Sequence, residues 1–183
     1  IVQMNTQNSF VRDQCLVKIL RGNFKDDKDL DYLLKCSNLN FQGIAYFAIV
    51  LSTNIKGISN IRIEHLLSVL EDIFFIGARG YGVELVQEKM IGIIISIEEG
   101  TGDFNVEQNS IVKDILSLIK SNFEVNPVMG VGEIYKDIMH LNFSFLEALS
   151  ALYGSSNDNN TNIFFFSQMK DEKNQLSYYP IQE

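Results

Sequence analysis

Apolar side chains recur at helical spacing in five stretches of the chain, which predicts five amphipathic helices. In the clearest of these stretches, Leu66, Leu70 and Ile73 fall on one face, with acidic residues between them. Gly22 follows the first stretch, where glycine commonly ends a helix. The helices are expected over residues 6–21, 27–37, 63–74, 106–122 and 141–152.

Other stretches predict β-strands. The run over 43–53, GIAYFAIVLST, is continuously apolar, as expected for a strand that is covered on both faces. A short turn near Glu88 and Lys89 separates two further strands and predicts a hairpin. Pro127 lies within a fourth strand, which favours a sheet edge or a strand start. The strands are expected over 43–53, 81–87, 90–97, 125–131 and 163–166.

Residues 43–131 therefore follow the order β-α-β-β-α-β. This order is that of the split βαβ, ferredoxin-like arrangement, an α+β fold with helices on one face of an antiparallel sheet. A further helix and strand follow this core, and two helices precede it.

Two glycine-rich stretches could in principle hold an anion. GARGYG, over 77–82, carries Arg79, but it is expected to be a plain connector between a helix and a strand. Gly130 and Gly132 end a strand and are followed by a polar spacer. A phosphate cradle would need them directly at a helix N-terminus, so a backbone role is favoured over ligand contact.

Charge and composition narrow the range of partners. The 183 residues carry a net charge of −8, and the 15 basic side chains are scattered. A DNA-binding face needs clustered lysine and arginine, so direct contact with nucleic acid is not expected. No apolar run approaches the roughly 18–20 residues that span a bilayer, so no membrane contact of this chain is expected either.

Cys15 and Cys36 are the only cysteines, which fits a reducing compartment such as the cytoplasm. We expect two separately buried thiols, and a disulfide between them stays open. His65 and His140 have no Cys or His at ligand spacing, so no metal site is expected. The chain opens at Ile1 and reads as a fragment, so membrane anchoring of the parent protein also stays open.

Three stretches resemble the second half of nucleotide cyclases of the diguanylate type. VMGVG, over 128–132, looks like the strand of that family that ends in Gly-x-Gly. FLEALSALYG, over 145–154, looks like its helix ending in Ala-Leu-Tyr, and NTNIFFF, over 160–166, falls where its last strand lies. The resemblance implies the same ferredoxin-like core.

The catalytic residues of that family do not recur in this chain. Where the family has Gly-Gly-Asp/Glu-Glu-Phe, the chain has VQEKM, which includes Gln87, Glu88 and Lys89. Ser52 and Asn54 stand where the family has an aspartate that binds Mg²⁺. Neutral oxygens are weak Mg²⁺ ligands beside carboxylates and phosphates. From this comparison with the cyclases, the chain is expected to have no catalytic residue, no metal and no cofactor.

A closer resemblance is to the degenerate GGDEF-like middle domain of AraC-type bacterial transcriptional regulators. The sequence over 130–154 is similar to the Gly-x-Gly, leucine and Ser-Tyr-x-Glu-Ala-x-x-Ala-Leu pattern of that domain, with phenylalanine in place of tyrosine. The flanks FVRDQCLVKILRGNF, over 10–24, and SYYPIQE, over 177–183, also look like those of that domain. The matching positions are Gly130, Gly132, Leu141, Ser144, Phe145, Glu147, Ala148, Ala151 and Leu152.

This resemblance implies an N-terminal helical segment over 1–40, a degenerate GGDEF-like domain over 41–168 and a linking tail over 169–183. It also implies a non-catalytic relay domain, whose parent protein contacts DNA through a C-terminal domain outside this chain. Three alternatives stay open: a nucleotide or small-ligand sensor derived from a cyclase, the related middle domain of PucR- or CdaR-type regulators, and a homodimerisation module.

Overall fold

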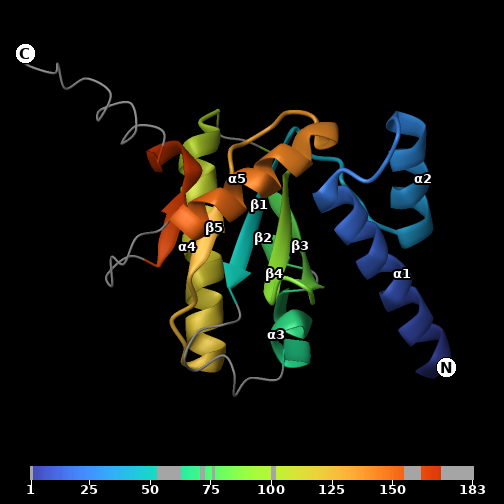
Figure 1. Cartoon of the computed structure of the whole chain (residues 1–183), viewed down its shortest axis with the longest axis horizontal. Coiled ribbons are helices and arrows are strands. Elements are labelled where there is room, and N and C mark those ends of the chain that lie inside the picture. Colours follow the sequence, from blue (N-terminus) through green and yellow to red (C-terminus); the bar gives the residue numbers. More distant parts are fainter. Residues whose placement is uncertain are drawn as a thin grey trace, which may run out of the picture.

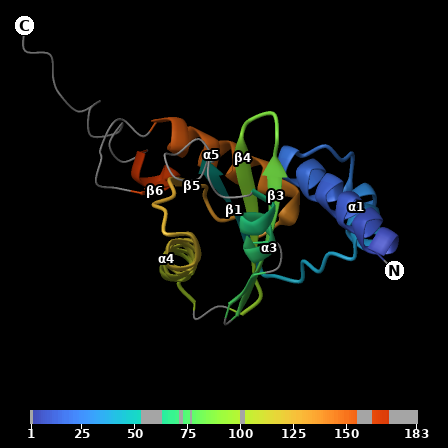
Figure 2. The same cartoon turned by 90° about the horizontal axis from the view of Figure 1, so that it is seen from below.

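A computed structural model describes residues 2–52, 63–70, 73–75, 77–99, 102–154 and 162–169 of the chain. Within these residues, six strands form one sheet in the order β2-β3-β4-β1-β5-β6 (Figures 1 and 2). The strands are β1 (Ala45–Ser52), β2 (Ile73–Phe75), β3 (Ala78–Leu85), β4 (Met90–Ile97), β5 (Met129–Val131) and β6 (Ile163–Phe165).

The predicted α+β class and ferredoxin-like core are confirmed. β1 pairs antiparallel with both β4 and β5, and β3 pairs antiparallel with β4. The four strands β3-β4-β1-β5 therefore have the order of the split βαβ arrangement. β2 extends the sheet beside β3, and β6 extends it parallel to β5.

The helices agree with the predicted ones to within a few residues at most ends. Asp26 accepts a hydrogen bond from the Asp29 N–H at the start of the second helix, and Asp103 caps the fourth in the same way. A short 3₁₀ helix, η2 (Ile138–His140), precedes the last one. The α-helices are α1 (Val2–Arg21), α2 (Asp27–Ser37), α3 (Ile63–Leu70), α4 (Phe104–Phe123) and α5 (Leu141–Gly154).

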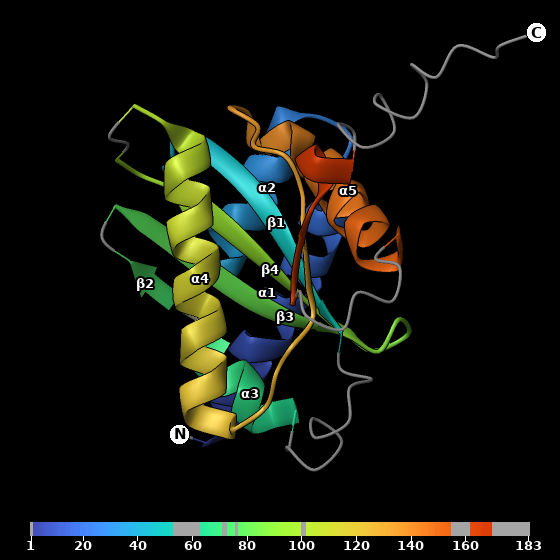
Figure 3. The ribbon, with the colours of Figure 1, turned by 90° about the vertical axis from the view of Figure 1, so that its left-hand side faces the viewer.

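One face of the sheet is covered by α3 and α4, the two helices of the ferredoxin-like core. Phe47, Ile49 and Leu51 of β1 point toward this face and are fully buried against residues of α3 and α4. Figure 3 shows α4 running across the front of the sheet. The helices of the core thus lie on one face, as the sequence predicts.

The opposite face is covered by α5, α1 and α2. Tyr46, Ala48 and Val50 of β1 point this way and join a second apolar cluster. β1 is therefore buried on both sides, which explains its unbroken apolar run. The two clusters lie on opposite faces of the sheet, with α4 and α5 separated by it (Figure 2).

The C-terminal part of α1 belongs to this second cluster. Leu16, Ile19 and Leu20 are fully buried. Gly92 of β4 lies directly beneath Leu20, and a side chain at that position would collide with the leucine methyl group. α1 is thus seated on the sheet itself.

The predicted helix over 63–74 is wrong at Ile73 and Phe74. Ile73–Phe75 is a strand that pairs with β3, and Gly77, with φ of 75°, makes the turn between them. The connector predicted over 77–82 is therefore also wrong, because Ala78–Leu85 is a continuous strand. Gly82 allows the Leu70 carbonyl of α3 to approach this strand closely.

Two smaller expectations also need correction. β5 is three residues long and lies between β1 and β6, so the edge alternative for this strand is wrong, and Pro127 precedes it. Cys15 is buried but Cys36 is exposed, and both thiols are free. The tail residues 170–183 lie outside the described residues.

Candidate functional site

The ladder between β1 and β5 contains a β-bulge. Ile49 pairs with Val131, whereas Tyr46, three residues earlier on β1, pairs with Tyr135, four residues after Val131. The second strand therefore holds one extra residue between the two pairs. Tyr46 and Tyr135 exchange both backbone hydrogen bonds, at 2.7 and 2.8 Å, so the ladder resumes fully after the bulge.

Two side chains hold the backbone groups at the bulge. The Gly132 N–H donates to the Ala48 carbonyl at 3.0 Å, as in a regular ladder. A regular ladder would also join the Ala48 N–H to the Gly132 carbonyl. Here the Ala48 N–H instead donates to Ser144 Oγ at 2.9 Å, and the Gly132 carbonyl accepts from Gln108 Nε2 at 2.8 Å. Ser144 and Gln108 are both buried, so each satisfies a backbone group that water does not reach.

Ser144 and Glu147 of α5 also hold the extra residue of the bulge. Ser144 Oγ donates to the Glu133 carbonyl at 2.7 Å, and Glu147 Oε2 accepts from the Glu133 N–H at 3.0 Å. The other carboxylate oxygen of Glu147 accepts from the Tyr135 hydroxyl at 2.9 Å. The helix therefore fixes the course of the chain over 133–135.

The environment of Tyr135 disfavours its phenolate form. Burial of the ring, the hydrogen bond to Glu147 and the negative charges of Glu147 and Glu133 raise the pKa of Tyr135 to about 12. The hydroxyl thus remains a donor throughout the physiological pH range.

The two glycines of the Gly-x-Gly sequence lie directly against α5. A side chain at Gly130 would meet the carbonyl of Ala148, and one at Gly132 would meet the carbonyl and hydroxyl of Ser144. Both positions therefore need glycine so that the strand can approach the helix backbone. This geometry gives them a packing role and leaves no cradle for a phosphate at their Cα atoms.

The other motif positions of α5 serve the core. Five of them are buried and face the sheet: Leu141, Phe145, Ala148, Ala151 and Leu152. The motif that carries the family resemblance thus consists of residues that pack α5 on the sheet and residues that hydrogen-bond the backbone groups of the bulge.

The residues that the sequence resemblance sets against the catalytic residues of the cyclases lie at one end of the sheet. Ser52, the last residue of β1, pairs with Met90, and Met90 also pairs with Leu85 across the hairpin. The turn over 86–89 therefore lies beside Ser52, with Lys89 at φ of 53°. Asn54 lies outside the described residues.

Glu88 is the one carboxylate among Ser52, Gln87, Glu88 and Lys89, and it is engaged by α1. Arg21 Nη2 lies 2.6 Å from Glu88 Oε1, and both side chains are about one-third exposed (33% and 31%). A guanidinium on this carboxylate opposes its use as a metal ligand. Among the described residues, no group of three or more His, Cys, Asp or Glu side chains could hold a metal ion.

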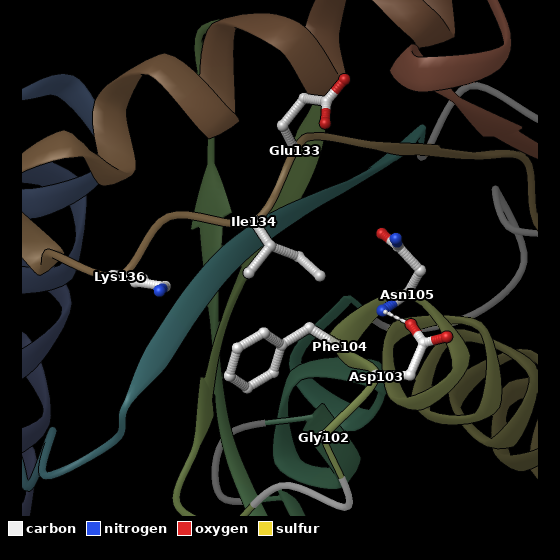
Figure 4. Close-up of a pocket in the computed structure, with 7 residues that line it drawn as sticks. All are labelled: Gly102, Asp103, Phe104, Asn105, Glu133, Ile134 and Lys136. Atoms are coloured by element: carbon white, nitrogen blue, oxygen red, sulfur yellow. Dashed lines mark hydrogen bonds between the residues drawn. The ribbon is translucent and has the colours of Figure 1, made fainter.

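A shallow hollow of about 320 Å³ lies where α4 begins, on the far side of the bulge. Figure 4 shows Phe104 and Ile134 pointing toward one another at its centre, with Lys136 beside them and Glu133 turned away. Asp103 is occupied as the helix cap, since it accepts from the N–H groups of Asn105 and Val106. The hollow thus combines two apolar side chains, Phe104 and Ile134, with a mostly polar lining that includes Asp103, Glu133 and Lys136.

Three residues that matter here are not identified from the sequence. Gln108 lies on the buried stripe of α4, three residues before Ile111, and a polar residue on an apolar stripe was the available signal. Tyr135 and Arg21 carry no such signal, because their partners Glu147 and Glu88 are distant in sequence.

The two histidines lie apart from one another. His65 contacts the ring of Phe123, and His140 stacks on Phe143 with an interplanar angle of 19°.

No helix within the described part of the chain is both long and apolar enough to cross a membrane. Neither a model of a known protein family nor any curated protein matches this chain.

Proposed function

We propose that this chain is a non-catalytic relay domain of an AraC-type bacterial transcriptional regulator that works in the cytoplasm. In this proposal α1 receives the input, and another domain of the parent protein contacts DNA. The ion pair between Arg21 and Glu88 carries the proposal, because it ties α1 to the hairpin where a cyclase would hold its nucleotide.

The chemistry of the hairpin end supports a non-catalytic role. Two-metal phosphoryl transfer needs carboxylates that hold Mg²⁺ at this place. Ser52 and Gln87 offer neutral oxygens, and the Glu88 carboxylate already faces a guanidinium. Incubation of the chain with GTP and Mg²⁺ should therefore yield no pyrophosphate and no cyclic nucleotide, and measurable product would contradict this part of the proposal.

The packing of α1 supports a relay role. Its buried residues Leu16, Ile19 and Leu20 lie on the sheet face that also carries α5. Gly22, just past the end of α1, lies against the side chain of Asn142 at the start of α5. A displacement of α1 would therefore disturb β4, the hairpin and α5 together. Coupling of this kind requires an element with two arrangements that the input and the output sites both bias.

The test compares hydrogen exchange in the wild-type chain and in the Arg21→Gln variant. Loss of the ion pair should speed exchange of the backbone amides of residues 86–92, while those of α4 stay unchanged. Lys18→Gln is the matched control, since it removes an exposed positive charge one turn earlier on α1. Equal exchange in all three proteins would mean that α1 and the hairpin are not coupled.

In the full-length regulator, Arg21→Gln should shift the inducer dependence of transcription from a reporter promoter, and Lys18→Gln should not. The assignment to AraC-type regulators also predicts two helix-turn-helix motifs encoded downstream of this chain. Absence of both motifs from the parent gene would contradict the assignment.

One observation favours small-ligand sensing as a second function. The hollow beside Phe104, Ile134 and Lys136 has a volume at the lower end of the range typical of ligand pockets. Calorimetry with GTP, cyclic dinucleotides and purines tests this function. Micromolar binding that is lost in Lys136→Ala and kept in Lys113→Ala, an exposed lysine of α4, would favour the sensor.

A further inference from the structure

The outward side of α5 carries an uncovered apolar stripe. Phe143, Leu146 and Tyr153 are 49%, 55% and 70% exposed, and Ser150 lies between them on the same side. At 3.6 residues per turn, these positions fall within roughly 80° of the helix circumference and extend over about 15 Å. We call these four residues the α5 stripe.

The spacing of the α5 stripe is that of a helix-pairing seam. Positions 143, 146, 150 and 153 are separated by three, four and three residues, which is the a/d spacing of a coiled coil. The inward positions of α5 already pack on the sheet, so this second seam is additional to what the fold of the chain requires. The geometry therefore fits one further helix along the outside of α5.

The stripe carries no charge, although the protein as a whole has a net charge of −8. Glu147 is the one charged residue of α5, and its two oxygens are bound to the Glu133 N–H and the Tyr135 hydroxyl. The Ser150 hydroxyl donates to the Leu146 carbonyl of its own helix at 2.8 Å, so it can be covered without losing a hydrogen bond. Depletion of charge is typical of the centre of a protein interface.

The order of large and small residues makes the stripe complementary to itself. Two antiparallel copies of α5, related by a two-fold axis beside position 148, bring Leu146 opposite the partner's Ser150. The same axis brings Phe143 opposite the partner's Tyr153. Positions 143 and 150 are a positions, and positions 146 and 153 are d positions. Each layer therefore pairs an a position with a d position, as antiparallel coiled coils do. Because the four residues of the α5 stripe are uncharged, pairing through them brings no two like charges into direct contact.

We propose that the α5 stripe is the contact surface of a homodimer, in which two copies of the chain pair antiparallel through α5. The three exposed apolar side chains offer on the order of 400 Å² per copy, less than the roughly 800 Å² per partner of a standard interface. The dimer is therefore expected to be weak, with a dissociation constant between about 10 μM and 1 mM. This proposal is independent of the relay role and stands without it.

Sedimentation equilibrium of the whole chain tests the proposal. The wild-type chain should dimerise with rising concentration, and Leu146→Glu should weaken dimerisation about tenfold or more, because it places two like charges in the seam. Val106→Glu is the matched control, since Val106 is 62% exposed on α4, on the other side of the sheet, and this variant should dimerise like the wild type. Unchanged thermal unfolding of both monomers shows that the substitutions act on association.

Disulfide trapping tests the antiparallel register. In a Cys36→Ser background, a mixture of Leu146→Cys and Ser150→Cys chains should form a crosslinked heterodimer on mild oxidation, and either chain alone should crosslink much less. A wild-type chain that stays monomeric up to about 1 mM would overturn the proposal and assign the stripe to residues 170–183 or to another protein. Dimerisation that survives Leu146→Glu would overturn it as well.

Discussion

Ser144 Oγ lies 2.9 Å from the backbone nitrogen of Ala48, a residue that precedes it by 96 positions in the sequence, and it accepts the hydrogen bond of that N–H. The same oxygen donates to the Glu133 carbonyl at 2.7 Å. One hydroxyl on α5 thus joins the central strand β1 to the bulge that follows β5.

Ser144→Ala should therefore lower the free energy of unfolding by about 2–3 kcal/mol, because it leaves the Ala48 N–H and the Glu133 carbonyl without these bonds. Urea denaturation at neutral pH measures the loss. Ser150→Ala is the control, since the Ser150 hydroxyl is exposed and bonds within its own helix, and its effect should be below about 0.5 kcal/mol. Equal effects of the two substitutions would contradict the bridging role of Ser144.

Gly132→Ala should destabilise the chain by about 3 kcal/mol or more, since the added methyl group would overlap the carbonyl and hydroxyl of Ser144. The neighbouring backbone cannot move away without separating α5 from β5. Gly154→Ala is the matched control, because its methyl group would meet only the flexible end of the Met169 side chain. Thermal unfolding should show a much lower midpoint for the first variant and a nearly unchanged midpoint for the second.

Stability should fall between about pH 10 and pH 12 through the ionisation of Tyr135. The folded-state pKa of about 12 exceeds the ordinary value of 10.0, so the stabilisation is complete below pH 10 and is lost as the pH rises through 12. After allowance for solvent screening of this partly exposed group, the loss is on the order of 1 kcal/mol.

Tyr135→Phe provides the measurement. At pH 8 this variant should be less stable than the wild type by about 1 kcal/mol, because it lacks the bond to Glu147. The difference between the two proteins should shrink above pH 10. In an absorbance titration of the phenolates, the variant should lack the component that titrates near pH 12, and retention of that component would assign it to another tyrosine.

The ion pair between Arg21 and Glu88 should contribute little to stability. Both side chains are about one-third exposed, so a double-mutant cycle of Arg21→Gln and Glu88→Gln should give a coupling energy of about 0.5 kcal/mol. The coupling should decrease further in 1 M NaCl, where the Debye length is about 3 Å. A coupling energy well above about 1 kcal/mol would mean that the pair is a structural support of the domain.

Local patterns of side chains were sufficient to predict most of the fold. The apolar run of β1, the turn at Glu88 and Lys89, and the stripe of α4 each follow from the local sequence and appear where expected. The main exceptions are β2 and the first residues of β3, where a helix end and a connector are expected. Ile73 and Phe74 continue the helical spacing of α3, so spacing alone cannot reveal that the chain leaves the helix and pairs with β3.

The candidate site depends on contacts between residues that are far apart in the sequence, and it was therefore harder to predict. A bulge is one extra residue in a strand, and no feature of Glu133 or Ile134 marks it in the sequence. Ser144 and Glu147 were singled out through the family resemblance, but their bonds to Ala48, Glu133 and Tyr135 require the three-dimensional structure. The exposed side of α5 also becomes visible only once the inward side is known.

Both edges of the sheet are three-residue strands, β2 and β6, while the strands of eight residues lie inside it. An edge strand exposes backbone groups that other chains can bind, and a short edge presents few of them. The long apolar strands of this acidic chain are therefore shielded from open-ended growth into fibrils.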